Sequence, residues 1–91
     1  MMTRGEKVAA LTGTAATGKP LYEANCIACH LADGTGNASG ANIKNAAKTE
    51  TVTQLATTII SGKGKMVAYG TMYTDQQVAD IVAYVKATFG N

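Results

Sequence analysis

The chain has 91 residues, a formal net charge of +2, and 46% hydrophobic, 5% aromatic and 15% charged residues. This length predicts one small domain, near the size at which a hydrophobic core alone gives little stability. The weak charge makes nucleic acid or an anionic membrane surface a poor partner, and no apolar run approaches the roughly 20 residues that span a bilayer.

The first 17 residues are rich in Thr, Ala and Gly, and we expect residues 1–17 to be an N-terminal extension that lies on the domain as an arm or a short helical turn. Thr3 and Glu6 have the spacing of a capping box, and Val8 and Leu11 are candidate anchors. The apolar run from Val8 to Leu11 is too short for the core of a signal peptide. We therefore expect that a signal was removed, or that the chain is a form made for expression.

A helix is predicted from about residue 18, with Pro20 in its first turn, where the missing N–H loses no hydrogen bond. Gly18, Tyr22 and Cys26 follow one another at intervals of four residues and share one face of this helix. Glycine early in a helix costs about 1 kcal/mol relative to alanine. Its presence indicates that another backbone passes closely there.

The run Cys26-Ile27-Ala28-Cys29-His30 is the attachment motif of a covalently bound c-type haem. On a helix these two thiols and the imidazole point to one side, so Cys26 and Cys29 can form thioether links while His30 binds the iron. A disulfide between the cysteines would close too small a loop to stabilise a fold. A haem would also supply the bulk that a core poor in aromatic residues lacks, and its bonds would cross-link the fold.

Other metal and redox sites fit the sequence less well. A structural zinc site needs about four ligands, and His30 is the only histidine beside two cysteines. A thioredoxin-like Cys-x-x-Cys pair expects a βαβ context, and no strand pattern is convincing here. The single histidine also excludes ligation of the iron by two histidines of one chain.

The pattern Gly18-x-x-x-Tyr22-x-x-x-Cys26-x-x-Cys29-His30 resembles the N-terminal helix of the class I c-type cytochromes, small bacterial monohaem electron carriers. Leu31-Ala32-Asp33-Gly34-Thr35-Gly36 resembles the run that follows the motif in that family, with Leu31 in place of the usual glycine. The resemblance spans about residues 18–88. It implies an all-α fold, the small cytochrome c fold, in which three main helices and long loops wrap around one covalent haem c within residues 18–91.

Residues 31–50 contain several glycines and no sustained periodicity, so we predict a long loop that wraps around something. The family resemblance implies that Gly40-Ala41-Asn42-Ile43 stands where a Gly-Pro-x-Leu segment places a backbone carbonyl against the second ring nitrogen of the haem histidine. Ala41 and Ile43 are therefore expected beside the haem, with Ala41 in the place of proline.

Two further helices are predicted after this loop. Thr51 and Gln54 form a capping box before an apolar stripe that ends ahead of Gly62. Thr74 and Gln77 begin the strongest helix, whose apolar positions recur with helical spacing at Val78, Ile81, Val82, Val85 and Phe89. Tyr84 resembles the family's aromatic that meets the N-terminal helix, so we expect it near Gly18 and Tyr22. Lys86 suits the C-terminal end of this helix and Gly90 could end it.

The second axial ligand is expected in residues 62–73, because His and Met commonly hold the haem iron of electron carriers. This stretch resembles the family's G-K-G-x-M-P-A-F/Y segment, with Val67 in place of proline. Met66 and Met72 compete for the role. The resemblance favours Met66, which stands eight residues before Thr74, and leaves Met72 as a gap-filling core residue.

With both axial positions filled the iron offers no site to a substrate, so we predict a single-electron carrier between redox proteins and not an enzyme. Alternatives are a gas-binding or sensor haem domain with a labile Met ligand, and the electron-entry domain of a larger redox enzyme. Transient redox partner proteins, a monomer, no nucleic acid and no membrane span are expected. The resemblance implies the periplasm, because thioether attachment takes place outside the cytoplasm.

Overall fold

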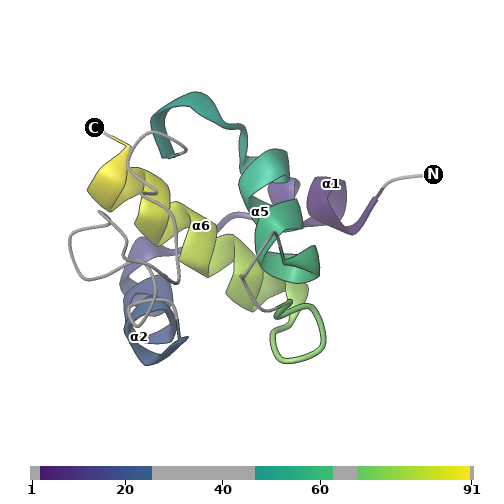
Figure 1. The fold of residues 1–91 in the computed structure, drawn as a ribbon. Helices are drawn as coiled ribbons and strands as arrows, with labels where there is room; N and C mark the ends of the chain where they lie inside the picture. Colours follow the sequence, from purple (N-terminus) through teal and green to yellow (C-terminus); the bar gives the residue numbers. More distant parts are fainter. Residues whose placement is uncertain (1–2, 26–46, 63–67, 91) are drawn as a thin grey trace.

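The described part of the chain, residues 3–25, 47–62 and 68–90 of a computed structural model, is built from helices. They are α1 (Arg4–Ala9), α2 (Ala15–Asn25), α5 (Val52–Ser61) and α6 (Asp75–Phe89), and residues 47–49 are also helical (Figure 1). No strand occurs within these three ranges. The predicted all-α class is therefore confirmed.

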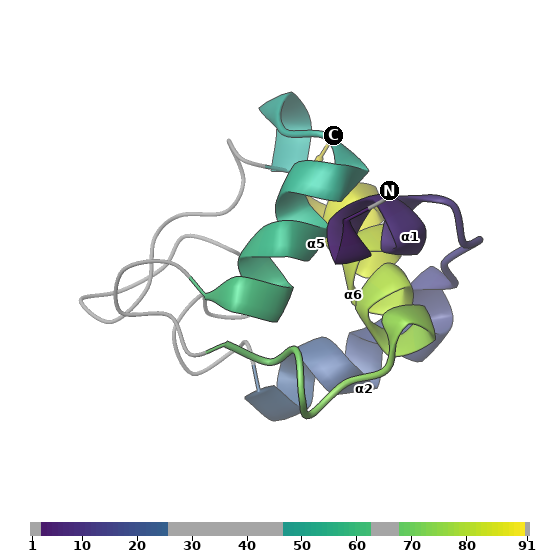
Figure 2. The ribbon, with the colours of Figure 1, turned by 90° about the vertical axis from the view of Figure 1, so that its right-hand side faces the viewer.

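Helix α6 lies at the centre of the described structure, between α2 on one side and α1 with α5 on the other (Figures 1 and 2). Its capping box is present, because the Thr74 hydroxyl accepts the Gln77 N–H and the Gln77 side chain accepts the Thr74 N–H at 2.9 Å. The buried positions include every member of the predicted stripe: Val78, Ala79, Asp80, Ile81, Val82, Val85 and Phe89. The helical period of the sequence thus identified the core face of this helix.

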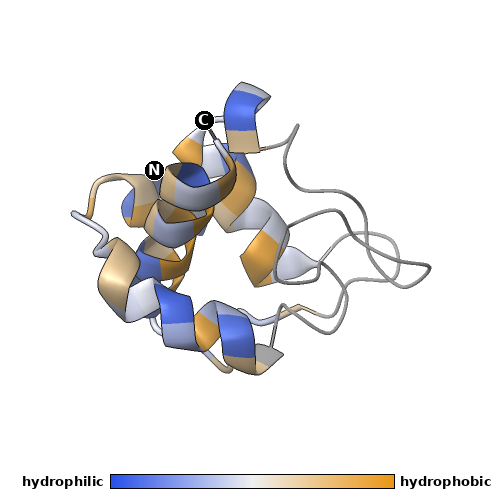
Figure 3. Ribbon diagram, turned by 90° about the vertical axis from the view of Figure 1, so that its left-hand side faces the viewer, coloured by the Kyte–Doolittle hydropathy of each residue, from blue (hydrophilic) through white to orange (hydrophobic). Residues whose placement is uncertain are grey.

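Hydrophobic and hydrophilic residues are interleaved along the helices (Figure 3). Each helix therefore buries one face and exposes the other, as expected for amphipathic helices around a shared core. Among the described residues, no helix combines the length and the apolar character that a membrane crossing requires.

Helix α2 begins at Ala15, three residues before the predicted start, and Pro20 lies inside it rather than in its first turn. The earlier start has a tertiary cause. The N–H of Thr14, just before the helix, donates to the carboxylate of the buried Asp80 at 2.8 Å. The Thr14 carbonyl then accepts the N–H of Gly18 at 3.0 Å. A negative charge from α6 therefore holds the positive end of α2 in place, and this contact outweighs the single hydrogen bond that Pro20 removes.

The crossing of α2 and α6 is formed by a glycine followed by a cluster of aromatic rings. A Cβ atom at Gly18 would overlap the carbonyl of Asp80, so the two backbones touch at this point. One turn further, Tyr22 is 1% exposed, and its ring centroid lies 5.3 Å from that of Tyr84 and 5.6 Å from that of Phe89. The predicted contact of Tyr22 with Tyr84 is confirmed, whereas the group that meets Gly18 is the backbone of Asp80.

Helix α1 packs into the same core as the other helices. Val8 is completely buried, as expected for an anchor, while Leu11 is exposed. At Gly5 a Cβ atom would overlap the Thr57 hydroxyl of α5, so α1 and α5 lie in close contact. The division of the chain after residue 17 stays a prediction.

The predicted capping boxes of α1 and α5 are also present. The Thr3 hydroxyl accepts the Glu6 N–H, and the Thr3 N–H donates to the Glu6 carboxylate at 3.0 Å. This backbone N–H, together with the Thr3 side chain, lowers the pKa of Glu6. In α5 the same exchange joins Thr51 to Gln54, and the helix is followed by Gly62, whose positive φ of 74° favours glycine.

Candidate haem-binding site

The side chains predicted to hold the haem lie outside the described residues. They are Cys26, Cys29, His30, Ala41, Ile43 and Met66. The structure does describe the elements next to two of them, Cys26 and Met66. Helix α2 ends at Asn25, directly before Cys26, and the chain is described again from Ala68, two residues after Met66.

The segment that begins at Ala68 is hydrogen-bonded to α2 as well as to α5. Figure 2 shows the C-terminal ends of these two helices pointing to the same edge of the molecule. The N–H groups of Tyr69 and Gly70 donate to the carbonyls of Ile59 and Ile60 in α5, at 2.9 and 3.0 Å. The chain that follows Met66 is thus bonded to α5.

The apolar side chains of these elements fit a bulky hydrophobic cofactor. Five of them pack against the core but stay only partly buried by the described residues: Leu21, Val52, Leu55, Ile60 and Tyr69. A small chain gains less from such side chains while they stay partly exposed. Two thiols, an imidazole and a thioether are also the groups that attach and ligate a c-type haem. The donor set and the apolar side chains of the flanking elements therefore fit the haem that the sequence predicts.

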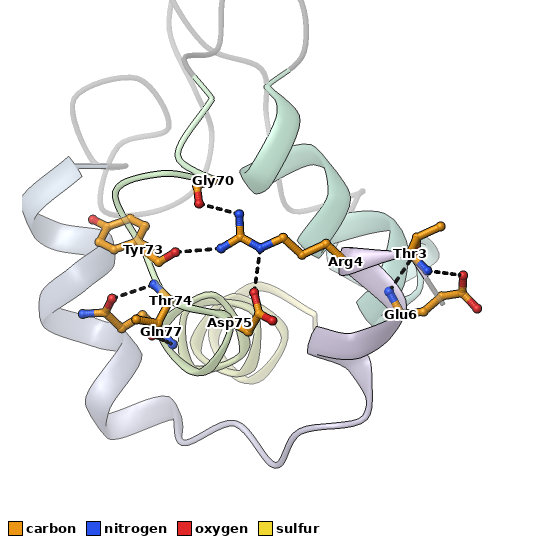
Figure 4. A network of polar contacts seen from close by, with 8 residues as sticks. All are labelled: Thr3, Arg4, Glu6, Gly70, Tyr73, Thr74, Asp75 and Gln77. Carbon is orange, nitrogen blue, oxygen red and sulfur yellow. Dashed lines mark hydrogen bonds and ion pairs between the residues drawn. The ribbon is translucent and has the colours of Figure 1, made fainter. Parts of the chain in front are cut away.

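Arg4 of α1 holds the segment between Met66 and α6, a contact that the sequence did not reveal (Figure 4). Its Nε lies 2.6 Å from an Asp75 carboxylate oxygen, and its two terminal nitrogens donate to the carbonyls of Gly70 and Tyr73, the latter at 2.9 Å. The guanidinium is planar and carries several N–H donors in a fixed fork, so one side chain can bind three acceptors.

Lys86 has a related role at the other end of α6. Its Nζ donates to the carbonyls of Ala47 and Glu50, at 3.1 and 2.8 Å. The sequence predicted that Lys86 suits the end of its own helix, and the structure adds that it binds the backbone where the described chain resumes after residue 46.

The expectation that Met72 fills a gap in the core is wrong, because this residue is 59% exposed. It lies in a turn in which the N–H groups of Met72 and Tyr73 both donate to the Tyr69 carbonyl, at 3.1 and 3.0 Å. The buried position of this turn belongs to Tyr73 instead.

The helical fold and the Cys-x-x-Cys-His motif together define a small c-type cytochrome, and comparisons with known proteins agree. Residues 13–85 match the family described as cytochrome C oxidase, cbb3-type, subunit III. The chain is 36% identical over 87 residues to cytochrome c6 of Gloeothece citriformis, covering 84% of this chain and 73% of that protein. It is also 36% identical over 76 residues to cytochrome c6 of Leptolyngbya boryana, covering 78% and 88%.

A solved structure shows the same fold. Cytochrome c6 from the diatom Phaeodactylum tricornutum superposes with a TM-score of 0.71 at 29% identity, covering 82% of this chain and 93% of that one. The chain therefore belongs to the family of small class I c-type cytochromes. Members of this family carry one covalently bound haem c and transfer electrons between redox proteins, and both properties apply to this protein.

Proposed function

We propose that Cys26 and Cys29 form the two thioether links, and that His30 and Met66 are the axial ligands of the haem iron. The carbonyl near Ala41 accepts the second ring N–H of His30, and Ile43 lies against the haem. The observation that supports this assignment best is the pair of hydrogen bonds from Tyr69 and Gly70 to α5. They fix the chain close to Met66 on the side of the molecule where α2 ends before Cys26.

The bound haem supplies a one-electron couple, and the chain determines what that couple can do. With an imidazole and a thioether as ligands, no coordination position is left for a substrate, so the protein transfers electrons and is not an enzyme. A thioether ligand also favours the ferrous state and raises the potential. The half-buried apolar side chains around the site limit the access of water to it.

We further propose that the protein is a monomer that meets its redox partners transiently, through a small interface that allows rapid exchange. The proposed location is the periplasm, because the attachment of haem through thioethers takes place outside the cytoplasm. Neither nucleic acid nor a membrane span has a part in this function.

The axial ligand is tested by replacing each methionine separately. In Met66→Ala we expect the red-end charge-transfer band of the ferric protein to disappear, because that band requires a thioether on the iron. The reduction potential of the haem should fall by a sizeable part of the roughly 0.8 V over which axial ligands set such potentials. Met72→Ala is the matched control, because its side chain is exposed, and it should keep both properties.

The opposite pattern would assign the ligand to Met72. The same proteins also test the gas-binding alternative, because carbon monoxide should bind readily to reduced Met66→Ala and only weakly to the unsubstituted protein. Ready binding to the unsubstituted protein at neutral pH would favour a sensor with a labile ligand.

A second candidate function is that of an electron-entry domain in a larger redox enzyme. One observation favours it, namely that the matching family is described by an oxidase subunit. The native gene distinguishes the two candidates. An open reading frame that continues from Asn91 into an enzyme domain would support the second, and a stop codon there would support the free carrier.

A further inference from the structure

The Arg4 clamp, defined by Arg4, Gly70, Tyr73 and Asp75, joins α1 to the segment before α6 and to the first residue of α6, which lie 66 to 71 residues further along the chain. Gly70 lies at its centre. Its N–H donates to the Ile60 carbonyl, and its own carbonyl accepts a hydrogen bond from Arg4. A Cβ atom at this position would lie 2.8 Å from the Ile60 oxygen and 2.9 Å from an Arg4 nitrogen. Gly70 is thus held between α5 on one side and Arg4 on the other.

Arg4 belongs to α1, and other contacts hold this helix in place. A helix of six residues is not stable alone, but α1 is held by the fully buried Val8 and by the close contact of Gly5 with α5. The packing of α1 therefore has supports other than the clamp. Residues 68–74, in contrast, are held by the hydrogen bonds of Tyr69 and Gly70 to α5 and by the bonds that Arg4 donates.

The two bonds to backbone carbonyls matter more than the ion pair. The side chains of Arg4 and Asp75 are 37% and 36% exposed, so solvent screens their attraction. The carbonyls of Gly70 and Tyr73, in contrast, belong to the segment itself. Hydrogen bonds from a charged donor to these groups restrict the backbone directly.

We propose that Arg4 is a positioning residue for the sixth haem ligand, a role that rests on the proposed ligation by Met66. Gly70 follows Met66 by four residues, so a fixed Gly70 limits how far the thioether can move away from the iron. Without the clamp the segment gains conformational freedom when the thioether dissociates, and dissociation becomes more favourable. Arg4 thereby lowers the apparent affinity of the haem iron for a ligand that competes with the thioether.

The experiment measures the competition of imidazole with the thioether in the ferric holoprotein. We expect Arg4→Ala to raise the apparent affinity for imidazole about tenfold, the effect of losing bonds from one charged donor. The red-end band should be lost at correspondingly lower imidazole concentrations. Arg4→Lys keeps the charge without the fork, so we expect a smaller increase, about threefold. The matched control is Lys7→Ala, which removes the same charge from an exposed position of α1 and should not change the affinity.

A purely structural role predicts a different result. In that case Arg4→Ala would lower the free energy of unfolding and leave the imidazole affinity unchanged, which would overturn the proposal. Should Arg4→Ala fail to fold, the affinities of Arg4→Lys and Lys7→Ala decide, and equal values for both would count against the clamp. Met66→Ala separates this inference from the proposed function. A band retained in Met66→Ala overturns both, whereas a band lost there with no effect at Arg4 overturns only the role of Arg4.

Discussion

Replacing Gly18 by alanine is expected to destabilise the protein by about 3 kcal/mol or more, the upper part of the range for overpacked sites. The new methyl group would overlap the carbonyl of Asp80 and lie 2.9 Å from the N–H nitrogen of Ile81. Both atoms belong to the backbone of α6, so no side-chain rotation can relieve the contact. Alanine favours a helix over glycine by about 1 kcal/mol, which is too little to offset the separation of two packed helices.

The free energy of unfolding of the holoprotein, measured with denaturant, tests this expectation. Lys19→Ala is the matched control, because it changes the next residue of α2 at an exposed position and should stay within about 0.5 kcal/mol of the unsubstituted protein. The near-ultraviolet circular dichroism of the aromatic cluster should weaken in Gly18→Ala and not in the control. A Gly18→Ala protein of unchanged or higher stability would show that the backbones do not touch at this crossing.

The features that depend on neighbouring residues were predicted well from the sequence. The capping boxes at Thr51 and Thr74 and the buried stripe of α6 are all present in the structure. Such patterns are local, because a cap joins residues three positions apart and a core face repeats with the helical period. The contact of Tyr22 with Tyr84 was available only through the family resemblance.

The features that depend on distant residues were missed or misplaced. The start of α2 is set by Asp80 and the segment before α6 is held by Arg4, and in both cases the partners are more than 60 residues apart. No spacing rule connects such residues. Met72 shows the same limit, because its hydrophobic character suggested a core position while the turn after Tyr69 leaves it exposed.

The candidate site combines both kinds of information. The motif at Cys26, Cys29 and His30 predicts covalent haem attachment without further context, since few other functions fit two thiols and an imidazole at this spacing. The assignments of Met66 and Ala41 depend on segments in which the chain lacks the proline usual in the family. The structure contributes contacts of the described residues that follow those segments, from Arg4 at the N-terminal end of α6 and from Lys86 near its C-terminal end.

The covalent haem is expected to decide whether this chain folds at all. Very small domains gain only about 3–5 kcal/mol from a hydrophobic core, and this chain is only slightly longer. Six apolar side chains that pack against the core stay partly exposed among the described residues, which removes part of even that contribution. A prosthetic group bound at several points can supply an energy comparable with the whole stability of such a domain, roughly 5–15 kcal/mol.

We therefore expect Cys26→Ser/Cys29→Ser, exported and purified like the unsubstituted protein, to lose both the haem and most of its helical structure. Haem content after denaturation in acid measures the covalent link, and far-ultraviolet circular dichroism measures the helices. Ala28→Ser is the matched control, because it adds a hydroxyl between the cysteines and keeps both thiols. A double variant that is free of haem yet as helical as the control would show that the described helices are stable without the cofactor. In that case another group would have to cover the partly buried side chains of α5.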